Sequence, residues 1–393
     1  GTDMQQRNFI DRRYFTKVLL RNKLVQCLYE EVISQEEENP GDVKFMYGVE
    51  VVNAVWEEGT NRVRLGLLKF SNNSSSNEEE RQQHYDEATY DFVCGVDGTA
   101  SAVRDAMGVM HAEQEKQDND SGGALDDSPY YMKYPPSNSR VYRTLKLNLP
   151  EGWRKDVNYA ARGDKDRELL FDVLPLERER EMLGVLLSRP GNPQMKDLNV
   201  TSSRQLMEDL FPQFSQMASD ESLQEFSDKG DSKLPDFAYC NGPLHYRNST
   251  VLLGDAIHTV KPYFGLGVNS ALEDILILDD AISACGSMGA ALKTYSEVRG
   301  PCARALVEMS RSYDRDVRNP INLLSFLVPL LLDNFFNSLA PSVFEKTELG
   351  LFQDERISFT EIVQRKKKDR ILQVLTITVF LMITGKMFPS IVS

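Results

Sequence analysis

The residues best suited to chemistry gather between positions 251 and 274, where the sequence reads VLLGDAIHTVKPYFGLGVNSALED. An apolar run, predicted to be a buried strand, ends at Gly254. Asp255 follows at its carboxyl end, a common place in α/β folds for a carboxylate that binds a ligand hydroxyl group. Gly265 and Gly267 would let the backbone lie flat against a planar ligand, because glycine has no side chain. The segment therefore predicts a binding turn for a flat, hydroxyl-bearing ligand.

A helix is predicted to follow this turn, with Asn269 as its N-cap and its end near Cys285. The N–H groups at the start of such a helix favour anionic oxygen or developing negative charge. His258 lies beside the turn, and we interpret it as a structural residue. A Gly-Asp pair and a glycine-rich turn alone could form any strand–turn–helix corner. The complete string, with Pro262 and the Glu273-Asp274 pair, is much more specific.

Two further segments could contribute to the same site. Asp97 and Gly98 follow a predicted buried strand in the string VDGTASAVR at 96–104. Arg21 opens a predicted helix in which apolar residues recur at three- and four-residue spacing. Each has an ordinary alternative, because an Asp-Gly pair is often only a turn and a helical arginine is often only solvated.

Together these strings resemble the FAD-dependent aromatic hydroxylases, the family of p-hydroxybenzoate hydroxylase. Within that family the resemblance is closest to the kynurenine 3-monooxygenases, on LDNFFxxLAPSxF at 332–344 and ExVQR at 361–365. It implies FAD as cofactor, NADPH as reductant, and hydroxylation or epoxidation of a small apolar, aromatic or polyene substrate by O2. The cofactor carries such chemistry, so the resemblance implies no catalytic side chain.

The resemblance also implies binding residues. Asp255 would bond a ribityl or ribose hydroxyl group, and the backbone at 267–269 would face the pyrimidine edge of the isoalloxazine. Tyr313 takes the position of a substrate-binding asparagine. The positions that match FAD contacts of the family are Arg21, Val51, Asp97, Asp255, Pro262, Gly265, Gly267, Val268 and Asn269.

The sequence also departs from the family pattern. No G-x-G-x-x-G occurs near the N-terminus, so either the chain is incomplete or the protein lacks that unit. Lys261 stands where a small or apolar residue is expected, and Glu348 or Leu349 replaces a substrate tyrosine. These differences argue against kynurenine as the substrate. The alternative is a non-catalytic, degenerate flavoprotein-fold subunit of a membrane complex.

The C-terminal segment predicts a membrane anchor. Residues 371–385 carry no charge, and 371–393 as a helix would approach the thickness of the hydrocarbon layer. Five basic residues precede it and would lie on the side of the membrane that retains positive charge: Arg365, Lys366, Lys367, Lys368 and Arg370. The alternative is a buried C-terminal helix. A second apolar run, 321–332, contains Pro329 and is too short to span; it is predicted to be a core helix unless it lies on the membrane surface.

The element pattern predicts an α/β fold with an α+β substrate layer: an incomplete Rossmann-like domain with an inserted β-sheet domain and a helical C-terminal region. Strands are predicted at 14–20, 43–55, 63–70, 90–96, 141–149, 169–174 and 182–188, a polar hairpin loop at 71–87, and a helix at 203–214.

The predicted divisions are a partial FAD-binding domain (1–110), an acidic linker (111–129), a β-rich substrate domain (130–245), the second part of the FAD-binding domain (246–300), a helical region (301–364), and a basic flank with anchor (365–393).

Composition limits the partners and the compartment. The 393 residues include 45 Lys and Arg against 59 Asp and Glu, a net charge of −14, which argues against a nucleic-acid partner. The five cysteines are scattered without metal-ligand spacing. We expect the bulk of the chain in a reducing aqueous compartment at an organelle membrane, mitochondrial or plastid.

Overall fold

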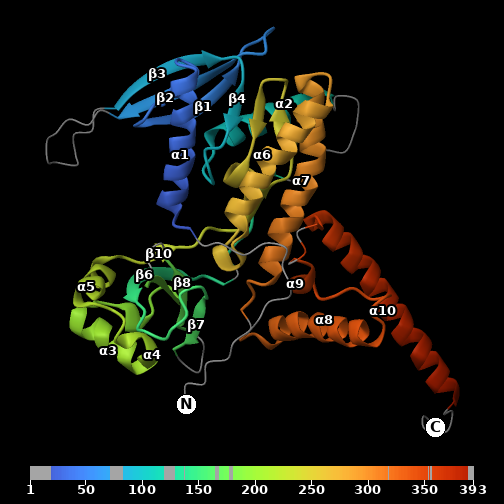
Figure 1. The fold of residues 1–393 in the computed structure, drawn as a ribbon. Helices are drawn as coiled ribbons and strands as arrows, with labels where there is room; N and C mark the ends of the chain where they lie inside the picture. The colour runs from blue at the N-terminus through green and yellow to red at the C-terminus, as the bar shows by residue number, and fades with distance from the viewer. Residues whose placement is uncertain are drawn as a thin grey trace. The chain divides into compact units, whose positions relative to one another are not determined.

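The computed structural model describes residues 19–70, 83–118, 129–136, 138–163, 168–176, 180–316, 318–352, 354 and 356–387. Figure 1 shows the fold and labels most of its elements. The chain divides into two units, each described by itself. The smaller comprises Gly1–Met46 and Asn138–Leu234, and the larger comprises Tyr47–Ser137 and Pro235–Ser393.

The larger unit contains three small sheets. The strands β1 (Val49–Trp56), β2 (Val63–Phe70) and β3 (Gln83–Tyr90) form an antiparallel sheet in that order. In the second sheet, β13 (Thr250–Leu252) pairs in parallel with β4 (Val93–Gly95) and antiparallel with β12 (His245–Tyr246). The third consists of β14 (His258–Thr259), β11 (Ala238–Cys240) and β5 (Tyr131–Lys133). Among the described strands of these sheets only the β4–β13 pair is parallel, as is typical of strands joined by a long crossover.

Helices cover these sheets and form the C-terminal part of the unit. Helix α2 (Ala102–Asp118) follows β4, and α6 (Leu266–Ala284) packs against α7 (Met288–Ser312). The chain ends in α8 (Pro320–Leu339), α9 (Glu348–Leu351) and α10 (Phe359–Met387). Helices and strands share the core of this unit. For example, the buried Tyr295 of α7 donates its hydroxyl proton to the Leu252 carbonyl of β13 at 3.1 Å.

The smaller unit carries a five-stranded sheet in the order β10 (Ser232–Lys233), β6 (Val141–Asn148), β9 (Glu181–Ser188), β8 (Leu170–Pro175), β7 (Tyr159–Arg162). Its pairings are antiparallel, and alternate side chains such as Phe171 and Val173 enter the core. Helices α3 (Val200–Leu210), α4 (Pro212–Ser215) and α5 (Asp220–Asp228) contribute Met207, Phe214 and Phe226 to the same core. The unit also contains α1 (Arg21–Glu38).

The structure confirms most of the predicted elements and corrects several boundaries. The helix from Arg21 and the strands near 63–70, 141–149, 169–174 and 182–188 are present. The strand predicted at 43–55 begins only at Val49, and the helix predicted at 203–214 breaks before Pro212, which cannot donate a helical hydrogen bond. The strand predicted at 14–20 lies almost wholly outside the described residues. The mixture of helices and sheets agrees with the predicted class, whereas the proposed domain divisions stay a prediction.

Two segments predicted to be irregular are partly regular. The polar loop predicted at 71–87 ends inside β3, which starts at Gln83 and pairs with β2 along its length. The acidic linker predicted from residue 111 begins inside α2, which continues to Asp118. In both places the residues are polar because the element faces solvent, so polarity there does not indicate a lack of regular secondary structure. Residues 71–82 and 119–128 lie outside the described residues.

The apolar C-terminal helices are largely exposed. Among the described residues, α8 is the one helix long and apolar enough to cross a membrane, and 11% of its apolar window is buried. The run 321–332 is thus part of a 20-residue helix, and the prediction that it forms a core helix was wrong. In α10 the apolar side chains from Ile371 to Ile383 are also mostly exposed, so the alternative of a buried C-terminal helix is wrong for the described part.

Candidate functional site

Two carboxylates follow neighbouring parallel strands. Gly95 of β4 lies opposite Leu252 of β13, and Asp97 and Asp255 come two and three residues later. Both side chains are exposed. Carboxyl ends of parallel strands open at the same edge of a sheet, which is where ligands bind in α/β folds. The structure thus brings together two of the residues predicted from separate strings.

Asp97 also organises the start of the helix that follows it. Its carboxylate accepts from the Ser101 hydroxyl group at 2.5 Å and from the Val103 N–H at 3.2 Å. These bonds hold the turn that contains Gly98, whose φ is +80°. One role of Asp97 is therefore to shape its own turn, and its exposed side chain keeps room for a further donor.

Arg104 ties the two strand ends to each other. Its guanidinium is buried, and Nη1 donates to the carbonyl oxygens of Thr99 and Ala256, each at 3.2 Å. The same group lies 3.6 Å from the ring centroid of Tyr131 and is paired with Asp105. Arg104 was part of the string at 96–104 but was not predicted as a site residue. Nothing in the sequence around it indicated that its side chain would reach Ala256.

The turn at Gly254 is fixed by a buried carboxylate. Gly254 has a positive φ of 63°, which side-chain-bearing residues rarely adopt, and its N–H donates to Asp274 at 2.6 Å. Asp274 is fully buried in α6 and also contacts His258 Nε2 at 3.0 Å. This contact agrees with the structural role expected of His258. Asp274, the second residue of the Glu273-Asp274 pair, thus holds the chain at Gly254, just after β13, against α6.

Arg299 of α7 completes this buried group. Its guanidinium donates to Asp274, to Glu273 at 2.8 Å, and to the Ser270 carbonyl at 2.9 Å. Burial by itself would lower the pKa of Arg299, but Asp274 and the other acidic neighbours raise it above its ordinary value. The arginine thus stays charged and balances Asp274. Nothing in the sequence around position 299 indicated this partner.

Lys261, which departs from the family pattern, has a clear role in the structure. Its ammonium group is buried and lies 2.5 Å from the Asp314 carboxylate just beyond the end of α7. The pair fixes the chain directly before Pro262, where the glycine-rich turn begins. A charged residue is tolerated at this position because a buried carboxylate faces it.

The glycine-rich turn leaves open space at the start of α6. A Cβ atom placed on Gly98, Gly265 or Gly267 would meet no atom of the described residues within 4 Å. Helix α6 begins at Leu266 with Gly265 as its N-cap, and this cap residue supplies no side chain to the first N–H groups. Asn269 therefore lies inside the first turn and is not the predicted cap; its amide instead donates to the Gly265 carbonyl at 3.2 Å.

These features fit a flat, oxygen-rich cofactor such as FAD. Uncapped N–H groups at a helix start can receive a partly negative edge, and exposed carboxylates can accept from hydroxyl groups. Pro262, Val268 and Asn269 are exposed beside the open glycines. We use the name "corner" for residues 254–269. At Gly265 and Gly267 no side chain of the described residues, chain neighbours apart, lies within 4 Å of the place of a Cβ atom.

Two predicted FAD contacts lie on other elements. Arg21 is the first residue of α1, in the smaller unit, and its side chain is exposed. Val51 lies in β1 opposite Leu67, with a partly buried side chain packed against the core of the larger unit. The role of both residues in binding FAD stays a prediction.

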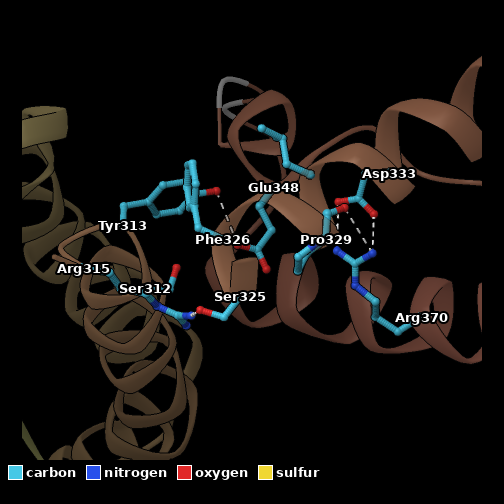
Figure 2. Close-up of a pocket in the computed structure, with 10 residues that line it drawn as sticks. Ser312, Tyr313, Arg315, Ser325, Phe326, Pro329, Asp333, Glu348 and Arg370 are labelled. Atoms are coloured by element: carbon cyan, nitrogen blue, oxygen red, sulfur yellow. Dashed lines mark hydrogen bonds and ion pairs between the residues drawn. The ribbon is translucent and has the colours of Figure 1, made fainter. Parts of the chain in front are cut away.

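Tyr313 lines a separate cavity of about 140 Å³ between the end of α7, the middle of α8, the start of α9 and Arg370 of α10. Figure 2 shows its hydroxyl group directed at Glu348, 3.3 Å away. Glu348 is one of the two residues, with Leu349, predicted to stand in place of a substrate tyrosine of the family. Burial, and then the Glu348 carboxylate, raise the pKa of Tyr313 above its ordinary value. Asp333 and Arg370 close another side of this cavity.

Comparison with known proteins finds a matching family model and curated relatives. The sequence model of the family described as "FAD binding domain" matches residues 26–310, well over half of the chain. The chain is 31% identical over 132 residues to kynurenine 3-monooxygenase of Salinispora tropica, an alignment covering 33% of this chain and 29% of that protein. It is 26% identical over 284 residues to violacein synthase of Chromobacterium violaceum, covering 70% and 61%. The chain thus spans less than two thirds of the length of these relatives.

One solved structure has a comparable backbone. A variant of MHPCO, 2-methyl-3-hydroxypyridine-5-carboxylic acid oxygenase, superposes with a TM-score of 0.52 at 16% identity, covering 75% of this chain and 66% of that one. At this identity the likeness concerns the fold alone. It agrees with the arrangement of mixed helices and sheets described above.

Proposed function

The chain belongs to the FAD-binding domain family, and from this premise we propose that the protein is an FAD-dependent monooxygenase related to kynurenine 3-monooxygenase. The observation that carries the proposal is the open corner beside two exposed carboxylates, Asp97 and Asp255, at adjacent parallel strand ends. Bound FAD would supply the redox chemistry with O2, which amino-acid side chains cannot perform.

The residues of the corner have distinct parts in holding FAD. Asp255 accepts a hydrogen bond from a ribityl or ribose hydroxyl group, and Asp97 lies at the neighbouring strand end. The backbone N–H groups at 267–269, at the start of the helix, would hold the pyrimidine edge of the bound ring and stabilise negative charge there. Gly265 and Gly267 allow the ring to approach the backbone closely. The buried pairs described above support this geometry by fixing the start and the middle of the corner: Asp274 with Arg299, and Lys261 with Asp314.

NAD(P)H is the proposed reductant and a small apolar or aromatic compound the proposed substrate. By the resemblance, Tyr313 takes the place of a substrate asparagine of the family, and Glu348 or Leu349 takes the place of a substrate tyrosine. A buried tyrosine hydroxyl paired with a carboxylate differs in charge from an asparagine paired with a tyrosine. We therefore propose a substrate other than kynurenine.

Membrane attachment through 371–393 is part of the proposal. The exposed apolar side chains between Ile371 and Ile383 support it, because such a surface is unfavourable in water. Lys367 and Lys368 are exposed directly before this run and suit an anionic lipid surface. An organelle membrane is the proposed location.

Replacing Asp255 by alanine is expected to weaken FAD binding about 10- to 100-fold, since a hydrogen bond to a charged group contributes about 1.5–3 kcal/mol. The measurement is a titration of the purified full-length protein with FAD, followed by flavin fluorescence. Asp280→Ala is the matched control, because Asp280 is an exposed carboxylate on α6 away from the corner. Equal affinities for both variants and the unaltered protein would exclude Asp255 from the site.

A further inference from the structure

Helix α8 presents an unbroken apolar stripe to its surroundings. Six large apolar side chains recur at intervals of three or four residues, which places them on one face of the helix. Each is between 46% and 75% exposed. We call this set the α8 stripe: Ile321, Leu324, Val328, Leu331, Phe335 and Leu339. A surface of this size and order requires an apolar partner.

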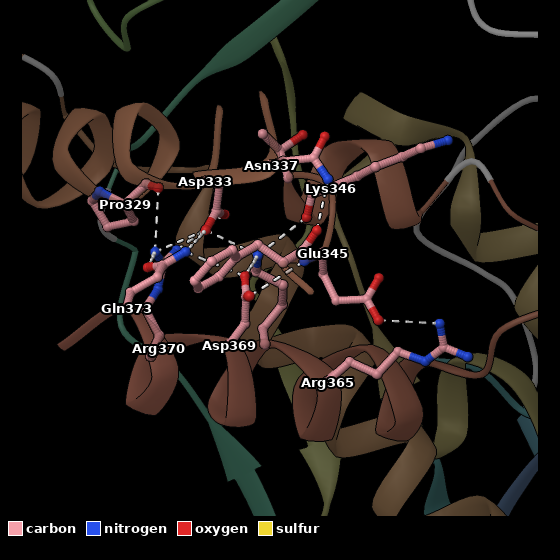
Figure 3. A network of polar contacts seen from close by, with 12 residues as sticks. Pro329, Asp333, Asn337, Glu345, Lys346, Arg365, Asp369, Arg370 and Gln373 are labelled. Atoms are coloured by element: carbon pink, nitrogen blue, oxygen red, sulfur yellow. Dashed lines mark hydrogen bonds and ion pairs between the residues drawn. The ribbon is translucent and has the colours of Figure 1, made fainter. Parts of the chain in front are cut away.

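Asp333, on the side of α8 away from the stripe, is held by polar residues of α10. Figure 3 shows Asp333 directed at Arg370 and Gln373. Asp333 pairs with Arg370 at 2.8 Å and Lys366 at 2.9 Å, and accepts from Gln373 at 3.1 Å. Asp369 pairs with Lys366 at 2.7 Å. We call these five residues the Asp333 cluster; all except Arg370 are at least nine-tenths buried.

The Asp333 cluster fixes the depth of α8 relative to the apolar part of α10. Its members Lys366, Asp369 and Arg370 directly precede the apolar run that begins at Ile371. If that run enters a bilayer, its first residue lies at the boundary between head groups and hydrocarbon. Asp333, in the second half of α8, is then held at the same boundary.

We propose that α8 lies flat in the interface of an anionic membrane, with the α8 stripe toward the acyl chains, and does not span the bilayer. The inference rests on the proposed anchor at 371–393. A spanning α8 would carry Asp333 into the hydrocarbon and draw Lys366 and Arg370 after it, which is strongly unfavourable. A flat α8 keeps this neutral cluster at head-group level while the stripe is buried.

Charge supports a lipid surface as the partner of the α8 stripe. In the Asp333 cluster two carboxylates balance two cations, so that Lys366 and Arg370 contribute no surplus charge. Lys367 and Lys368 are exposed on the same turn of α10 and remain available for anionic head groups. A basic margin continuous with an apolar face is typical of interfacial helices.

The test measures the depth of single labels in the full-length protein bound to vesicles of phosphatidylcholine and phosphatidylglycerol. The accessible thiols at Cys27, Cys94 and Cys285 are replaced by serine, and one cysteine carrying a fluorophore is introduced by Leu331→Cys, Val379→Cys or Lys293→Cys. All three labelled positions are exposed, so the labels are expected to be tolerated. Lipids carry a quencher either near the head group or near the end of the acyl chain.

The proposal predicts that the label at 331 loses more fluorescence to the shallow quencher, the label at 379 loses more to the deep one, and the label at 293 is unaffected. Deep quenching at both 331 and 379 would overturn the proposal by showing that α8 spans. No quenching at 331 with deep quenching at 379 would also overturn it, since α8 would face water or another protein. No quenching at 379 would refute the anchor itself, whatever the result at 331.

Discussion

Replacing Asp274 by asparagine is expected to destabilise the larger unit by about 3–5 kcal/mol, one of the largest effects of a single substitution in the molecule. The change leaves the buried Arg299 without its principal counter-charge and weakens the bond that holds Gly254 in its left-handed conformation. The measurement is urea unfolding followed by the fluorescence of Trp56, which is buried in this unit. A Trp153→Phe background removes the signal of the smaller unit.

Glu273→Gln is the matched control for this result. Glu273 binds the same arginine, yet its side chain is 43% exposed, so water can replace the lost charge. We expect it to cost no more than about 1 kcal/mol. If the two variants lost equal stability, Asp274 would not be the residue that fixes the corner.

Lys261→Met is expected to cost a similar amount, about 3–5 kcal/mol, because it removes the ammonium group that lies 2.5 Å from the buried Asp314 carboxylate. FAD affinity should fall as well, since the pair positions the chain directly before Pro262. Urea unfolding and FAD titration measure the two effects on the same preparation.

The double variant Lys261→Met with Asp314→Leu makes this prediction specific. Exchanging a buried ion pair for apolar side chains is often close to neutral, so the double variant should recover most of the stability lost by Lys261→Met. Additive losses in the double variant would show that the two side chains are not coupled.

The corner could be predicted from the sequence because its signals are local. A strand ending near Gly254, a carboxylate at 255 and two glycines at the start of a helix lie within a short segment, and each residue type restricts the backbone directly. Its supports could not be predicted, since Arg299 and Asp314 reach their partners Asp274 and Lys261 from 25 and 53 residues away along the chain. Side chains that distant are brought together only by tertiary packing.

The α8 helix shows a different limit of prediction from the sequence. Its apolar run correctly indicated a helix, but an apolar run does not distinguish a protein core from a lipid surface. The deciding residue is Asp333, which the sequence places among leucines and phenylalanines without any visible partner. Only the structure shows that Lys366 and Arg370 approach it and leave the stripe facing outward.

Hydrogen exchange of the full-length protein with and without FAD tests most directly whether the corner is the flavin site. We predict that FAD slows exchange of backbone amides at 254–269 and 97–104, while amides of α3 and α5 are unchanged. Binding of FAD with protection confined to other segments, or no binding at all, would contradict the proposed site.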